Sequence, residues 1–179
     1  MDWTGIAGEW WRLRRPTWAD EPAIAEHGRG PEPRWIGIGP SSPPERAHEV
    51  TQQFVKGATG DFGLVHLAVH QESGAILAMI GAQEHPPDSA RAGTVEIVYG
   101  VAPAWRGRGL ATEILTRVAH EAQEQGESRP LELVIAAQNA ASIRVAEKSG
   151  FRFVGTRSTY VEGTGQTYDD LVYVPSWQR

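Results

Sequence analysis

Two arginines alternate with two glycines at residues 106–109, directly before a segment with helical patterning. Glycine lets a backbone approach a ligand closely, and a guanidinium forms charge-assisted hydrogen bonds with anionic oxygens. The first N–H groups of a helix have no internal partner and lie at the positive end of its dipole, so they also bind anions. Arg106, Gly107, Arg108 and Gly109 therefore predict a phosphate-binding loop.

Three phosphate-loop patterns can be compared with this stretch. A Walker loop needs a lysine followed by serine or threonine after its last glycine, and GRGLAT has neither in place. A dinucleotide fingerprint needs a third glycine where Thr112 stands, and the usual downstream acid has no clear candidate. The third pattern, R-x-x-G-x-A, is matched by Arg106, Gly109 and Ala111.

The elements around the loop are predicted from periodicity and end signals. A β-rich strand at 94–101 precedes it, and the best-patterned helix of the chain starts near Gly109 and stops at Gly126. This order of elements predicts a mixed α/β sheet with helices on its faces. Further strands are expected at 9–14, 61–70, 74–83, 131–137, 151–162 and 166–174, and further helices at 16–27, 42–56 and 139–149.

Two blocks, EIVYGVAPAWRGRGLATEIL and NAASIRVAEKSGFRFVG, together resemble the GNAT superfamily of acyl-CoA-dependent N-acetyltransferases. Within it, the chain looks like the branch that includes ribosomal-protein N-terminal acetyltransferases. The likeness covers residues 94–155, and elsewhere only the element order agrees. It implies a single GNAT domain over 1–179, an α/β fold whose fourth and fifth strands splay apart.

The resemblance implies acetyl-CoA as cofactor, with its pyrophosphate at the glycine–arginine loop. Val101 would pair with the pantetheine arm as an added strand does. Asn139 and Ser142 would lie near the thioester, although asparagine at this position is also an ordinary helix cap. The expected cofactor-binding residues are Val101, Arg106, Gly107, Arg108, Gly109, Leu110, Ala111, Thr112, Asn139 and Ser142.

The implied reaction transfers acetyl directly to a primary amine of a small molecule or a protein N-terminus. Glu96 is the candidate base, although it could equally be a solvated strand residue or an ion-pair partner. Aligning VAEKSGF with the family's LYEKLGF puts Ala146 where many relatives carry a tyrosine that donates a proton to the leaving thiolate. Ser142, Tyr160 or water then supplies the proton, or the thiolate leaves unassisted.

Two other functions stay open. A non-catalytic acyl-CoA-binding module would keep the loop and lose turnover, which the missing tyrosine permits. A dinucleotide-dependent oxidoreductase would use GRGLAT for a nucleotide instead.

The bulk composition limits the remaining classes. The 179 residues carry a net charge of -5, which argues against nucleic acid as a partner, and no apolar stretch reaches the ~20 residues of a membrane span. With no cysteine there are no disulfides or thiolate metal sites, and the composition fits the cytoplasm.

His66 and His70, four apart on a strand, lack a third ligand, so no metal is expected. Dimers are common among relatives, and Trp35 is the best candidate to line an acceptor pocket.

Overall fold

The computed structural model describes residues 1–28, 44–57, 63–85, 89, 91–161 and 166–178. A seven-stranded sheet has the order β1-β2-β3-β4-β5-β7-β6. The described chain divides into two compact units, Met1–Gln83 with Val98–Ala111, and Glu84–Ile97 with Thr112–Arg179. The elements are β1 (Trp11–Arg14), η1 (Trp18–Asp20), α1 (Glu21–Gly28), α2 (Pro44–Lys56), β2 (Leu64–His70), β3 (Ile76–Glu84), β4 (Val95–Val101), η3 (Pro103–Trp105), α3 (Leu110–Glu124), β5 (Leu131–Ala136), α4 (Ala140–Lys148), β6 (Phe151–Val161) and β7 (Gln166–Pro175).

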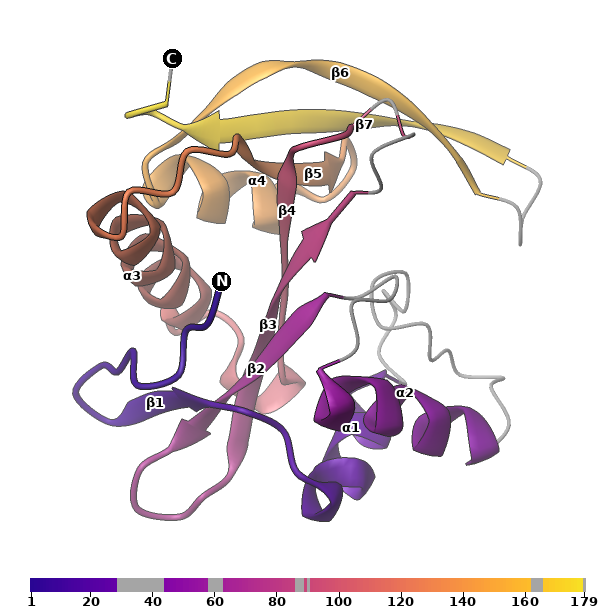
Figure 1. The fold of residues 1–179 in the computed structure, drawn as a ribbon, viewed down its shortest axis with the longest axis vertical. Coiled ribbons are helices and arrows are strands. Elements are labelled where there is room, and N and C mark those ends of the chain that lie inside the picture. Colours follow the sequence, from indigo (N-terminus) through magenta and orange to yellow (C-terminus); the bar gives the residue numbers. More distant parts are fainter. Residues whose placement is uncertain (29–43, 58–62, 86–88, 90, 162–165, 179) are drawn as a thin grey trace. The chain divides into compact units, whose positions relative to one another are not determined.

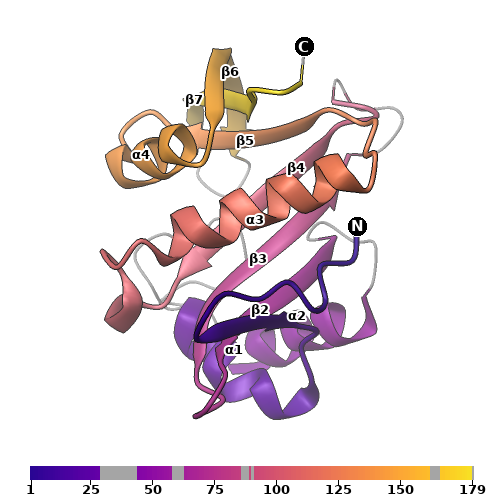
Figure 2. The same ribbon diagram turned by 90° about the vertical axis from the view of Figure 1, so that its left-hand side faces the viewer.

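In the first unit, α1 and α2 pack on the antiparallel strands β2 and β3 (Figures 1 and 2). The residues of α2 that contact the core recur at helical spacing, which is why this amphipathic segment forms a helix here. The helix begins at Pro44, while Ser42 and Pro43 of the expected capping box lie outside the described residues. The core cluster contains Ile24, Ala47, Val50, Phe54, Val65, Leu67, Val69 and Met79.

In the second unit, β6 and β7 form a long antiparallel hairpin, and β7 also pairs with β5 (Figure 1). Figure 2 shows α4 beside β5 and β6. The Asn139 side chain accepts a hydrogen bond from Ser142 N at 3.1 Å, so the expected cap of α4 is confirmed. Gly150 has a φ of 80°, the left-handed conformation that ends the helix. The GTG turn expected between β6 and β7 lies outside the described residues.

Three elements, β3, β4 and α3, each contribute residues to both units. On β4, Val95 and Ile97 are buried while Glu96 is only partly exposed, so the alternation expected for this strand is confirmed. At its first two residues β4 pairs in parallel with β5, Val95 opposite Leu131 and Glu96 opposite Glu132. The pairing fixes the two glutamates as neighbours on adjacent strands.

The expected mixed α/β architecture is confirmed, and the predicted helices and strands recur in the same order. The helix expected at 16–27 is divided into the short turn η1 and α1. The turn η3 was absent from the sequence-based expectation, because three residues are too few to show periodicity. Along α3 the predicted apolar stripe is buried at Ile114, Leu115, Val118, Ala119 and Ala122. Among the described helices, none is both long and apolar enough to cross a membrane.

Candidate active site

The glycine–arginine loop has the backbone conformation that its glycines predict. Gly107 and Gly109 have φ values of 74° and 79°, which L side chains rarely adopt. A Cβ built on either would meet no heavy atom within 4 Å, so the space beside both glycines is open. Helix α3 begins at the next residue, Leu110, and its first backbone N–H groups have no intrahelical partner. This open, donor-rich backbone fits a pyrophosphate.

Both arginines of the loop contact the protein. Arg106 Nε donates to the Val101 carbonyl at 3.0 Å. The Arg108 guanidinium carbon lies 4.9 Å from the centre of the Trp105 ring, a cation–π distance. Trp105 in turn stacks on Trp10, with ring centroids 5.6 Å apart. The loop is therefore tied to its own unit through a half-buried aromatic pair.

The remaining residues expected at the cofactor differ in exposure. The Leu110 side chain belongs to the core, so only its backbone could reach a ligand. Ala111 and Thr112 are partly exposed in the first turn of α3, and the Thr112 carbonyl accepts from Ser149 Oγ at 3.2 Å. Asn139 and Ser142, at the start of α4, are also partly exposed. Their bond to each other is the cap described above.

The residue at the family's tyrosine position is buried. Ala146 is fully enclosed within its unit and carries no group that could donate a proton. Tyr160 lies on β6, but its side chain is outside the described part of the chain.

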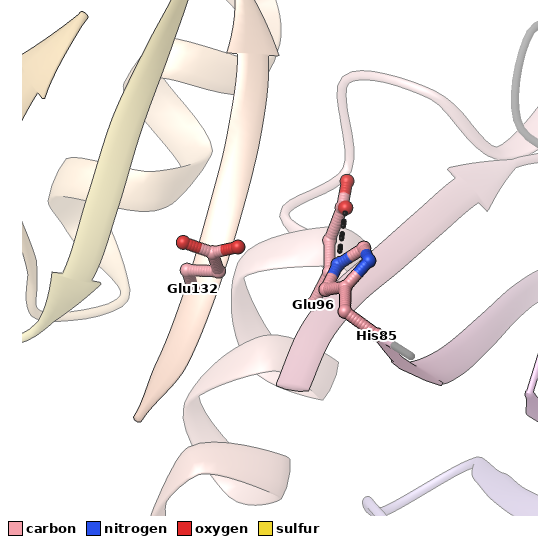
Figure 3. Close-up of side chains that lie close together, drawn as sticks. All are labelled: His85, Glu96 and Glu132. Carbon is pink, nitrogen blue, oxygen red and sulfur yellow. Dashed lines mark ion pairs between the residues drawn. The ribbon is translucent and has the colours of Figure 1, made fainter. Parts of the chain in front are cut away.

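Glu96 lies in a partly buried group of charges within the second unit (Figure 3). Arg91 Nη2 donates a hydrogen bond to Glu96 Oε2, and His85 Nε2 lies 3.3 Å from the same oxygen. Glu96 is therefore an ion-pair partner, one of the roles the sequence allowed. Sequence reasoning alone assigned it no neighbour.

Glu132 on β5 is the second carboxylate of this group, and its side chain is only 6% exposed. Arg91 Nε donates to it at 2.8 Å, and Arg157 adds two bonds of 3.1 Å. These two guanidiniums outweigh the effect of burial and lower the pKa of Glu132, so it stays charged. With Glu96, the group then holds two anions and two cations.

Donor atoms of His85, Glu96 and Glu132 all lie within 4.8 Å of one another, a spacing that a metal ion could bridge. Arg91 already binds both carboxylates, however, so a cation occupies the region between them. A divalent ion there would have to displace a charge-paired guanidinium. We therefore read this group as an ion-pair network.

His85 and its neighbours were not found from the sequence. Glu132 is the one charged residue in the apolar strand LELVIAA, and a buried carboxylate needs a partner. That signal predicts a cation without naming it, because Arg91 and Arg157 are 41 and 25 residues away along the chain. His85 lies in a stretch that reads only as a loop.

The two histidines compared as metal ligands have separate surroundings. His66 is buried; its Nε2 accepts from Trp3 N at 3.1 Å and lies 2.8 Å from Asp2 Oδ1. His70 is half-buried beside Trp10 and Trp105. The register shift between β2 and β3 leaves Leu77 of β3 unpaired in the ladder, while β2 itself runs on without a break between the two histidines. Trp35 lies outside the described residues.

Solved structures with the same fold are numerous. An acetyltransferase of the GNAT family from Bacillus anthracis has a TM-score of 0.77 at 16% identity, covering 94% of this chain and 96% of that one. The ribosomal-protein-S5-alanine acetyltransferase from Vibrio fischeri has a TM-score of 0.71 at 13% identity, with coverages of 96% and 95%. The Salmonella typhimurium protein yncA, solved with its cofactor acetyl-CoA, has a TM-score of 0.66 at 21% identity, with coverages of 94% and 95%.

Among curated proteins, no sequence matches this chain. The model of the acetyltransferase (GNAT) domain matches residues 11–152. That span includes the glycine–arginine loop, Glu96 and the capped start of α4. The chain therefore belongs to the GNAT acetyltransferase family, whose members transfer acetyl from acetyl-CoA.

Proposed function

We propose that this protein is an N-acetyltransferase that transfers acetyl from acetyl-CoA to a primary amine of a small molecule or a protein N-terminus. The observation that carries the proposal is the open glycine pair before α3, in a chain of the GNAT family. The sequence block around α4 favours the ribosomal-protein branch. We further propose one domain over residues 1–179 and, from the cysteine-free composition, a cytoplasmic location.

The loop binds the cofactor's pyrophosphate through the backbone of residues 107–112, with charge from Arg106 and Arg108. Arg106 Nε is engaged with the Val101 carbonyl in this structure. If Val101 pairs with the pantetheine arm through that carbonyl, Arg106 is released and its guanidinium can turn toward the phosphates. Binding of the arm and capture of the pyrophosphate would then be coupled.

Asn139 and Ser142 contribute at the thioester end of the cofactor. Ser142 is the proposed donor to the departing thiolate, because Ala146 cannot serve. Glu96 belongs to the group that handles the proton of the amine. No covalent enzyme intermediate is required, since the amine attacks the thioester directly.

Thermal stabilisation by added ligand tests which cofactor the protein binds. A ligand at 100 times its Kd adds ~2.7 kcal/mol to stability, and we expect this with acetyl-CoA and not with NAD(H). Stabilisation by NAD(H) alone would favour the oxidoreductase reading.

Release of free CoA thiol with a panel of amines then tests turnover. Acetyl-CoA binding without thiol release from any amine would favour the non-catalytic module, which the missing tyrosine leaves open.

A further inference from the structure

His85, the residue directly after β3, faces the carboxylate of Glu96. We propose that the His85 imidazole accepts the proton of the acceptor amine and that Glu96 orients this imidazole. The inference rests on the proposed acetyl transfer and divides its acid–base work between two residues. Glu96 becomes a positioning residue, and His85 the catalytic one.

Glu96 Oε2 already has partners. It accepts a hydrogen bond from Arg91 and faces His85. A substrate ammonium that donated to this oxygen would have to compete with a guanidinium held at the same time by Glu132. Glu96 is better placed to hold a neighbouring base than to act as the base.

The surroundings of the His85 imidazole favour one tautomer. The His85 side chain is 10% exposed, and its Nε2 is buried without a hydrogen bond in the described part of the chain. A carboxylate 3.3 Å away favours the tautomer with hydrogen on Nε2. That tautomer leaves a lone pair on Nδ1. In the carboxylate–histidine pairs of hydrolases the same division of roles holds with the two ring nitrogens exchanged.

The charges around His85 balance one another. Arg91 and Arg157 neutralise Glu96 and Glu132, so the imidazole sits in a partly buried group without net charge. Burial lowers the pKa of His85 and Arg91 lowers it further, against the opposite effects of Glu96 and Glu132. At pH 7 the ring is therefore neutral, the form that can take up a proton.

In the transfer step, the amine nitrogen forms a bond to the thioester carbonyl carbon while one N–H proton passes to His85 Nδ1. The C–S bond breaks, the electron pair stays on sulfur, and the amide and thiolate are the products. The imidazolium, stabilised by Glu96, then releases its proton to water, and the proton that Ser142 gives to the thiolate is restored from water.

His85→Gln is the direct test, in the full chain, with His120→Gln as the matched control because His120 is an exposed histidine on α3. Probes are acetyl-CoA with spermidine, L-phenylalanine or a hexapeptide that starts with serine. We expect His85→Gln to lower kcat at least ~100-fold, with acetyl-CoA stabilisation and unfolding temperature close to wild type. The control should keep its rate. An unchanged rate in His85→Gln would overturn the assignment.

Nitrogen NMR of the ring tests the proposal without turnover. Wild type should show a neutral His85 with hydrogen on Nε2 at pH 7, and Glu96→Gln should lose this preference. A cationic ring, or hydrogen on Nδ1, overturns the pair.

Two further controls distinguish a metal site from the histidine base, and a failure of the transferase function from a failure of the His85 assignment. Loss of activity on chelation with recovery on Zn²⁺ would instead assign the group to a metal. Wild type that binds acetyl-CoA but acetylates no probe would overturn the transferase function itself, whatever the ring's tautomer.

Discussion

Arg91 donates a hydrogen bond to Glu96, five residues further along the chain, and so joins the loop before β4 to the strand. The same guanidinium binds Glu132 on β5. One loop residue thus ties together two paired strands and places a positive charge near His85.

Arg91→Gln should shift the acidic side of the pH profile of kcat/KM. Arg91 lowers the pKa of His85, so removal of its charge raises that pKa. The neutral imidazole then forms only at higher pH, so the acidic side of the profile should move to higher pH. Arg117→Gln, a half-exposed arginine on α3, is the control. An acidic side that stays in place would show that His85 does not govern the pH profile.

Gly109→Ala should weaken acetyl-CoA binding by about tenfold or more. An L side chain at a φ of 79° strains the backbone, and its Cβ would stand where the phosphate approaches. Gly126→Ala, at the other end of α3 with a φ of 70° and an equally open Cβ position, carries the same strain without the ligand. Calorimetry measures the Kd of acetyl-CoA for the two variants. Equal affinities would show that the loop is not part of the cofactor site.

Asp20→Asn should cost roughly 2 kcal/mol or more of the free energy of unfolding at pH 7, as for hydrogen bonds to charged groups. Asp20 is buried and accepts two bonds of 2.7 Å from Arg14 and one of 2.7 Å from Thr17 N. These bonds outweigh burial and lower the pKa of Asp20. Its stabilisation is therefore complete above pH ~4 and is lost as pH falls through the lowered pKa.

Denaturant unfolding of wild type and Asp20→Asn from pH 2 to 7 measures this dependence. The difference between the two proteins should shrink in acid. A constant difference would mean that the charge of Asp20 contributes little.

Gly63→Ala should destabilise the fold more than Gly74→Ala. Both glycines have positive φ values, 57° and 71°, so the backbone strain is similar, about 1–2 kcal/mol. A Cβ on Gly63 would lie 1.8 Å from the Ala82 carbonyl oxygen, whereas one on Gly74 meets nothing within 4 Å. Thermal unfolding of both variants separates strain from this clash, and equal losses would show that the backbone at Ala82 yields.

Local sequence patterns predicted most of the secondary structure correctly. Asn139 caps α4, glycines follow both α3 and α4, and Val95 and Ile97 alternate with Glu96, because each of these features depends on residues a few positions apart. The glycine–arginine loop was found for the same reason. Its partner, the stack of Trp105 on Trp10, was not, since 95 residues separate the two rings.

The sequence by itself therefore determined the family, the α/β element order and the positive φ values of Gly107 and Gly109, since local spacing and turn residues encode all three. The phosphate-binding role of that loop stays a prediction. Only the tertiary structure decided that Glu96 is bound by Arg91, faces His85 and neighbours a buried Glu132. The physical reason is that a buried charge needs a partner but does not specify which one. Strand pairing brings residues 96 and 132 side by side, and Arg91 then binds both carboxylates.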